Sequence, residues 1–188
     1  MILPIVQYGD PMLRRKCDPI PEVDDAVRTL ADDMLETMVD AHGIGLAAPQ
    51  VDVPLRLAIV DVSHDPECVS YLRVDGKDVA MEDIMPLVFI NPELELLGKR
   101  DSAEEGCLSI REVRAQVTRP EALRARLPQL DGSVIELETD GLLARAIQHE
   151  TDHLNGILFI DRVSAATKVA LRRKLRRLAA ETASLRAV

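Results

Sequence analysis

The sequence predicts an α+β fold, in which antiparallel sheets pack around a central helix that carries a His-Glu-x-x-His pattern. Three observations lead to this fold class. Apolar residues recur at helical spacing in residues 27–39 and again in 142–154, short β-rich runs fill the chain between them, and a basic amphipathic stretch follows. With 188 residues, the chain is long enough for one domain with a sizeable core.

The first helix is expected over residues 27–39, after an extended start. Gly43 is expected to end it, because glycine accepts the left-handed conformation that commonly terminates helices. The apolar face of this helix comprises Val27, Leu30, Ala31, Met34, Leu35, Met38 and Val39.

Strands are expected at 55–62, 87–97 and 113–118, which are apolar and rich in β-branched residues. Residues 123–127 alternate apolar side chains with arginine, and Asp131-Gly132 separates them from another β-rich run. This pattern predicts a hairpin.

Residues 68–83 lack any such pattern. They are polar, contain a glycine and show no apolar periodicity, so we expect a mobile surface insertion there.

The central helix is expected over residues 142–154, with Thr139 or Asp140 as its N-cap and Gly156 as its end. Four of its residues share one stripe and should face the core. This stripe comprises Leu142, Ala146, His149 and His153.

Two histidines four residues apart on one helical face can bind a single metal ion. His149 and His153 have this spacing, and Glu150 lies between them, where it could accept a proton from a metal-bound water. The alternative is a pair of hydrogen-bonded core histidines without a metal.

A catalytic metal site has three protein ligands and an open position, whereas a structural site has four. One class of metalloprotease takes its third ligand from a downstream position that here is Phe159, which cannot bind a metal. A second class uses a downstream glutamate, which here would be Glu181, but that residue lies in a strongly basic helix. Upstream, Gly106 precedes Cys107 and would let the backbone approach closely. Cys107 is therefore the best third ligand.

Three cysteines without a Cys-x-x-Cys pair argue against a disulfide framework and favour a reducing compartment. No apolar run reaches membrane-spanning length, and residues 1–16 lack the basic-then-apolar order of a signal peptide. We therefore expect a cytoplasmic location and no membrane partner.

Charge is spread unevenly along the chain. Residues 164–188 hold seven basic residues and one acidic residue, a net charge of +6. Because the whole chain has a net charge of −9, residues 1–163 have a net charge of −15. The basic helix could meet nucleic acid, or it could dock on its own domain with its charges merely solvated. Its apolar stripe comprises Val169, Leu171, Leu175, Leu178, Ala179 and Leu185.

Three short motifs occur in order along the chain: GIGLAAPQ at residues 43–50, EGCLS at 105–109 and QHETDH at 148–153. Together they resemble the peptide deformylases, and the resemblance runs from about residue 3 to about 163. It implies a catalytic domain over 1–163, with 164–188 as a helical extension of the same domain.

The resemblance implies a metallohydrolase that removes the N-formyl group from the formylmethionine of newly synthesised polypeptides and releases formate. Cys107, His149 and His153 would hold one divalent ion, Fe²⁺ by resemblance, although Zn²⁺, Ni²⁺ and Co²⁺ suit the same donors. Glu150 would be the general base. The backbone N–H of Leu108 and the Gln50 side-chain amide would stabilise the developing oxyanion.

The resemblance also implies a peptide site. The residues expected to contact or border the peptide are Gly43, Ile44, Gly45, Leu46, Glu105, Arg114, Leu142 and Ala146. Residues 43–46 would pair with the peptide as an added strand, and Ile44, Leu142 and Ala146 would enclose the methionine. Glu105 would order the ligand loop, through Arg119, and Arg114 would lie near the peptide or be a solvated strand charge.

Two positions depart from the usual family pattern, Arg111 and Arg145, and both are expected to alter the pocket rim. His42 and His64 are expected to be ordinary surface or cap histidines.

Four readings of the chain remain. Besides the deformylase, they are a His-Glu-x-x-His metalloprotease, an inactive deformylase relative, and a non-catalytic nucleic-acid-binding protein with a structural zinc site. For the deformylase, the expected partners are formylmethionyl nascent peptides and the ribosome, with the basic helix contacting ribosomal RNA.

Overall fold

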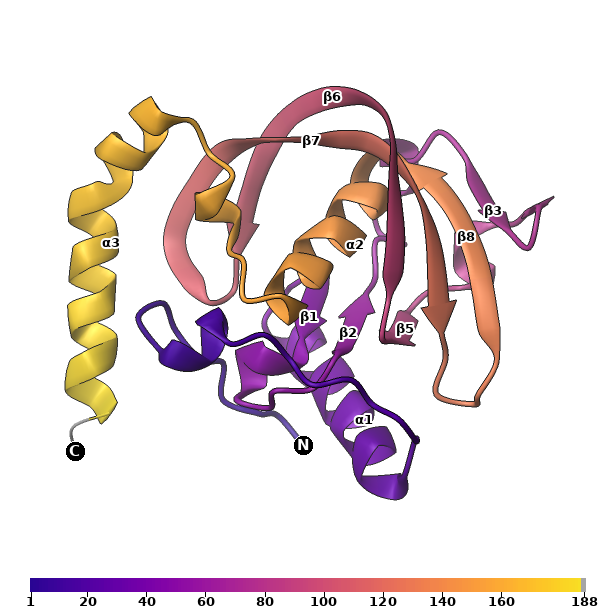
Figure 1. Ribbon diagram of the computed structural model, residues 1–188, viewed down its shortest axis with the longest axis horizontal. Helices are drawn as coiled ribbons and strands as arrows, with labels where there is room; N and C mark the ends of the chain where they lie inside the picture. The colour runs from indigo at the N-terminus through magenta and orange to yellow at the C-terminus, as the bar shows by residue number, and fades with distance from the viewer. Residues whose placement is uncertain (187–188) are drawn as a thin grey trace.

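The computed structural model describes residues 1–186 and confirms the α+β class (Figure 1). Its helices are α1 (Asp25–Asp40), α2 (Gly141–Leu154) and α3 (Ala165–Arg186), with short 3₁₀ turns at Pro11–Arg14, Ala48–Val51, Pro66–Cys68, Met81–Asp83 and Phe159–Asp161. Its strands are β1 (Gly45–Ala47), β2 (Leu57–Val60), β3 (Leu72–Val74), β4 (Lys77–Asp78), β5 (Leu87–Ile90), β6 (Glu93–Cys107), β7 (Ile110–Pro128) and β8 (Val134–Asp140).

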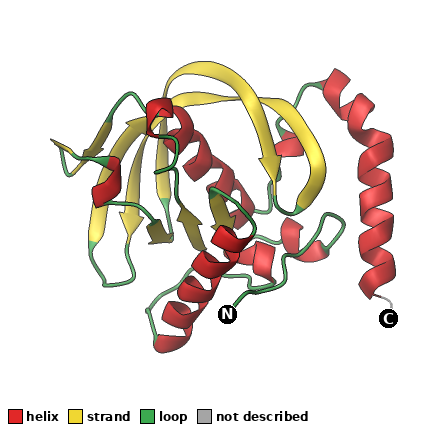
Figure 2. Ribbon diagram, turned by 180° about the vertical axis from the view of Figure 1, so that it is seen from behind, coloured by secondary structure: helices red, strands yellow, loops and turns green. Residues whose placement is uncertain are grey.

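Two antiparallel sheets enclose α2. The smaller has the strand order β1-β2-β5, and the larger has the order β4-β3-β8-β7-β6. Figures 1 and 2 show the long strands β6 and β7 bending over α2, while β1 and β2 lie on its other side. The predicted hairpin is confirmed as β7–β8, in which Ala125 pairs with Leu137.

The single strand predicted over 87–97 is wrong, because the chain turns at Asn91 and passes from β5 in one sheet to β6 in the other. Asn91 adopts a left-handed φ of 44°, and its side-chain amide exchanges two hydrogen bonds with the backbone of Ile20, at 2.7 and 2.9 Å. A tertiary contact therefore divides a continuous apolar run.

The insertion predicted over 68–83 is also corrected. Residues 72–78 form the β3–β4 hairpin, which turns at Gly76, and β3 pairs with β8. Leu72 and Met81 are buried in the main core. Strands of three and two residues are too short to show periodicity in a sequence.

Helix α1 ends at Asp40, with Ala41 as its C-cap, and the left-handed residue that follows lies one position before the predicted stop at Gly43. The residue with the left-handed backbone is His42, with φ 54°, rather than Gly43. The N–H of Gly43 then donates to the carbonyl of Met38 at 2.9 Å. His42 is thus a cap histidine, as predicted.

Three apolar clusters hold these elements together. The largest packs α2 between the two sheets, the second packs α1 against β1, β2 and β5, and the third joins the N-terminal segment, β7 and the Phe159–Asp161 turn to α3. Because α2 is enclosed by the largest cluster, the positions of its side chains are fixed by close packing.

Helix α3 lies along one side of the body (Figure 1). Leu171, Leu175 and Leu178 pack against the third cluster, so the docked amphipathic helix is confirmed. The predicted stripe is too long at both ends, since Val169 and Leu185 are 74% and 78% exposed. Among the described residues, no helix has the length and apolar content needed to cross a bilayer.

Candidate active site

Helix α2 is fixed at both ends by glycines. A Cβ at Gly141 would lie 1.8 Å from the carbonyl oxygen of Cys68, and one at Gly156 would lie 2.4 Å from that of Arg14. Both glycines also have a positive φ, which other residues rarely adopt. Asp140 occupies the N-cap position, but its carboxylate accepts from the N–H of Ser70 at 2.7 Å instead of capping the helix.

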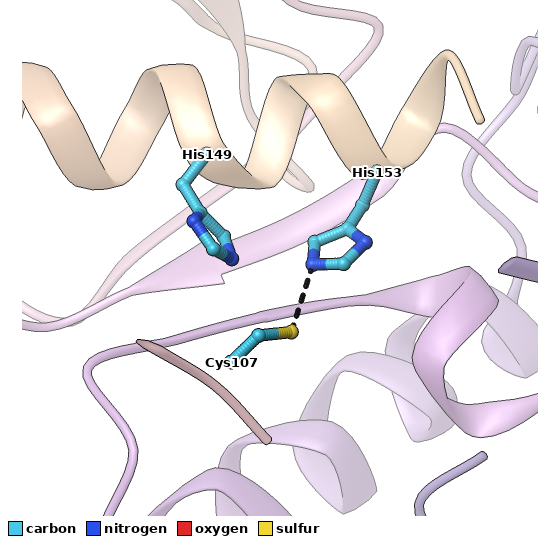
Figure 3. A group of neighbouring side chains, drawn as sticks. All are labelled: Cys107, His149 and His153. Carbon is cyan, nitrogen blue, oxygen red and sulfur yellow. Dashed lines mark hydrogen bonds between the residues drawn. The ribbon is translucent and has the colours of Figure 1, made fainter. Parts of the chain in front are cut away.

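Cys107, His149 and His153 converge on one point, with their donor atoms all within 4.8 Å of one another (Figure 3). Figure 3 shows both histidines pointing from α2 toward Cys107, whose Sγ lies 3.3 Å from Nε2 of His153. No fourth donor joins this group among residues 1–186, so these residues do not form a four-ligand structural site.

Glu105 supports the donor group through His149. Its carboxylate bonds to Nδ1 of His149 at 3.0 Å and accepts from Arg119 at 2.6 and 2.9 Å. This bond occupies Nδ1, so Nε2 of His149 is left for a metal. Burial alone would raise the pKa of Glu105, but hydrogen bonds from His149 and Arg119 outweigh it and lower the pKa. Arg119 is the partner expected from the sequence.

Two members of this ionic group were not predicted. Arg145 donates to Glu105 at 2.8 Å and to the carbonyl of Val117 at 2.9 Å, with only 11% of its side chain exposed. Arg145 therefore supports the ligand loop through Glu105, and it also borders the cleft, as expected for this position. Asp152 accepts from Arg119 at 2.7 Å and also pairs with Arg162. A charged residue on the core side of an apolar helix is the signal that could have revealed Asp152.

Glu150 is 4% exposed, and its Oε2 has no hydrogen-bond partner within the described part of the chain. Burial raises the pKa of Glu150 to about 7. A Cβ at Gly45 would lie 2.3 Å from Oε1 of Glu150, so this glycine makes room for the carboxylate. A Cβ at Gly106, by contrast, would make only ordinary contacts, the nearest at 3.5 Å. The prediction that a glycine is needed there for a close backbone approach is therefore wrong.

Gln50 is held beside the cysteine. Its Oε1 accepts from the N–H of Ala47 at 2.9 Å, and its Nε2 lies 3.2 Å from Oγ of Ser109 and 3.5 Å from Sγ of Cys107. The amide N–H of Leu108 has no acceptor among the described residues.

The electrostatic setting of the donor group fits a cation. Burial opposes a charge on His149, but its bonds to Cys107 and Glu105 favour one and raise its pKa to about 10. Burial lowers the pKa of His153 well below its ordinary value, so this imidazole is neutral and keeps a lone pair. One thiol and two imidazoles, with the Glu105 carboxylate bonded to one of the imidazoles, suit a divalent transition-metal ion.

A cleft of about 870 Å³ opens onto the donor group. It is lined by His42, Gly43, Ile44, Gly45, Gln50, His64, Asp65, Glu104, Glu105, Gly106, Cys107, Leu108, Ile110, Glu112, Val113, Arg114, Leu142, Arg145, Ala146, His149 and Glu150.

Most of the predicted peptide-site residues thus share the cleft, with two corrections. The Leu46 side chain is buried in the core beneath β1 and does not line it, whereas His42 and His64, which were set aside, both do. Arg114 lines the cleft with 73% of its side chain exposed, 3.6 Å from Glu104. Arg111 is exposed and lies outside the lining.

The two downstream positions at which a protease would carry its third ligand do not supply one. Phe159 stacks on His149 with ring centroids 6.0 Å apart, and Glu181 lies on α3, 3.7 Å from Arg177. Neither belongs to the donor group.

Known proteins similar to this chain agree with one another. The family model described as polypeptide deformylase matches residues 2–169. The peptide deformylase of Cellvibrio japonicus is 45% identical over 93% of this chain and 94% of that protein, and that of Chromohalobacter salexigens is 47% identical over 93% and 94%. The crystal structure of a Synechococcus elongatus peptide deformylase in complex with actinonin is 36% identical over 96% of this chain and 86% of that one, with a TM-score of 0.75.

Proposed function

The chain belongs to the polypeptide deformylase family and so removes the formyl group of newly made polypeptides, and we propose that its substrate is N-terminal formylmethionine. We also propose that one metal ion serves the reaction. The observation that carries this proposal is the convergence of Cys107, His149 and His153 beside the unpaired Glu150 carboxylate, at an open cleft.

We propose Fe²⁺ as the physiological ion, although Zn²⁺, Ni²⁺ and Co²⁺ suit the same thiolate and imidazole donors. When bound, a divalent ion supplies a Lewis acid and lowers the pKa of water. Glu105 would fix the orientation of His149, and Arg119 and Arg145 would keep Glu105 anionic.

Glu150 would take a proton from the attacking water and pass it to the departing amine of methionine. Its unpaired Oε2 and its pKa of about 7, raised by burial, support this general-base and general-acid role. The Gln50 side-chain amide and the Leu108 N–H would donate to the oxygen that becomes negative. Support for Gln50 is its fixed orientation, since Ala47 holds its oxygen and leaves the NH₂ toward Cys107.

The peptide would extend the small sheet. β1 is an edge strand, paired with β2 on one side only, so a peptide backbone could add beside residues 43–46. Ile44, Leu142 and Ala146 would enclose the methionine side chain. Leu46 would contribute its backbone alone, because its side chain is buried.

We further propose that residues 1–163 form the catalytic domain, that 164–188 extend it, and that α3 contacts ribosomal RNA in the cytoplasm. Arg172, Arg173 and Arg176 are exposed, and the described residues include no carboxylate paired with them. They are free to meet phosphates while the acidic body would be repelled. Arg177, which follows Arg176 on α3, is bonded to Glu112 instead.

The decisive experiment uses protein purified without oxygen, with its metal content measured and formate release followed on formyl-Met-Ala-Ser. We expect formate release, loss of activity in air for the iron form, and protection by nickel. Absence of formate release by folded, metal-loaded protein would identify an inactive relative. Cleavage of unformylated casein would identify a protease.

A further inference from the structure

A wide bulge follows the cysteine ligand. Between the pairs Gly106–Arg114 and Cys107–Ile110, β6 advances one residue while β7 advances four. Glu112 lies at the centre of the three extra residues, with a left-handed φ of 59°. That conformation is unfavourable for a residue with a side chain, so neighbouring contacts must hold it.

Helix α3 supplies those contacts. Nζ of Lys174 donates to the backbone carbonyl of Glu112, and Nη2 of Arg177 donates to its carboxylate at 3.0 Å. On the inner side, Ile110 and Val113 are buried in the same cluster that receives the leucines of α3. The bulge is therefore bonded to α3 through Glu112, and its buried residues share an apolar cluster with the leucines of that helix.

The bulge is also a wall of the active-site cleft. Ile110, Glu112, Val113 and Arg114 all line the cleft, whereas no residue of α3 does. Lys174 and Arg177 can thus reach the substrate site only through Glu112. Both lie beyond residue 169, where the family match ends.

We propose that Lys174 and Arg177 are positioning residues for deformylation, which set the peptide-binding wall of the cleft by holding Glu112. The inference rests on the proposed peptide site in this cleft. The histidine donors and Glu150 lie on α2 and are fixed separately, by Glu105 and by the ends of that helix, and Cys107 also contacts Gln50 and His153. Loss of the contact with Glu112 should therefore change KM and leave kcat nearly unchanged.

The test compares kcat and KM on formyl-Met-Ala-Ser amide, which carries no charge. Arg177→Gln should raise KM roughly two- to fivefold, the range of one exposed ion pair, with kcat within twofold. Arg177→Lys, which keeps the charge, should recover most of the wild-type KM. Lys168→Gln is the matched control, because Lys168 is an exposed cation of the same helix without an ion pair among the described residues, and it should change neither constant.

A double-mutant cycle separates positioning from a direct effect of Glu112 on the substrate. Glu112→Gln should raise KM by a similar factor, and the double variant should be no worse than either single variant. Multiplicative effects in the double variant, or an unchanged KM in Arg177→Gln, overturn the proposal.

The dependence of KM on salt supplies a second readout. The wild-type KM should rise toward the Arg177→Gln value as salt screens the exposed pair, while the KM of Arg177→Gln should depend less on salt, because only Lys174 then faces the Glu112 carboxylate. A salt-independent wild-type KM also overturns the proposal. If formyl peptides are not hydrolysed at all, the proposed function fails, and this outcome is distinguishable from an unchanged KM in an active enzyme.

Discussion

Helices α2 and α3 both direct charged side chains at the β6–β7 pair, but in opposite settings. The Arg119–Glu105 pair beside α2 has side chains only 2% and 5% exposed, whereas the Arg177–Glu112 pair of α3 is 54% and 66% exposed. Buried charges lose the screening of water, so removal of one partner is costly, while an exposed pair contributes little. The buried pair can therefore fix the orientation of His149, whereas the exposed pair can change substrate binding only slightly.

The largest expected effect is on turnover. Glu150→Gln keeps the side-chain shape and removes the base, so kcat should fall by about a hundred- to ten-thousand-fold while the metal stays bound. Activity on formyl-Met-Ala-Ser and metal content are measured together, with the exposed Glu136→Gln as control. A parallel loss of metal would show that Glu150 is a ligand or a structural residue.

The next effect is on stability. Arg119→Met leaves the Glu105 and Asp152 carboxylates buried without their shared cation, so the free energy of unfolding should fall by about 3–5 kcal/mol. Arg177→Met should cost less than about 1 kcal/mol. Urea unfolding of the two variants measures the contrast, and equal losses would remove the distinction between the two ionic groups.

Gly45→Ala tests the space beside Glu150. The new methyl group would displace the carboxylate, and a shift of about 1 Å can reduce turnover up to about 100-fold. In a Glu150→Gln background, the same change should add little, since the group it disturbs no longer acts as a base. Two independent, multiplicative losses would contradict this explanation.

The smallest expected effect on turnover belongs to the exposed face of α3. Reversing the charge of Arg172, Arg173 and Arg176 should abolish salt-sensitive ribosome binding and change hydrolysis of a short formyl peptide by less than about twofold. Co-sedimentation with ribosomes at increasing salt measures the first, and formate release the second. Undiminished binding by a folded variant would leave α3 a structural helix.

The sequence predicted best what depends on local spacing. The helix with His149 and His153 follows from residues four positions apart, and Cys107 from the glycine-preceded motif and its resemblance. The ion pairs of Arg145 and Asp152 were not predicted, because their partners lie on strands distant in the sequence. Which carboxylate pairs with which guanidinium depends on the assembled sheet.

The same limit explains the errors in the fold. Asn91 divides an apolar run because its amide bonds to Ile20, seventy-one residues away. The side chain of Leu46 turns to the core because β1 pairs with β2, and no periodicity can be read from a strand of three residues. Such contacts between remote segments have no local signal.

The close backbone approaches at Gly141 and Gly156 bear on how the protein acquires its ion. A helix held at both ends and packed between two sheets fixes the spacing of His149 and His153 through the fold itself. Small zinc domains, in contrast, assemble around the ion and unfold without it. A site set in a helix packed in this way is expected to form without the ion, so chelation should remove a bound metal without unfolding the chain.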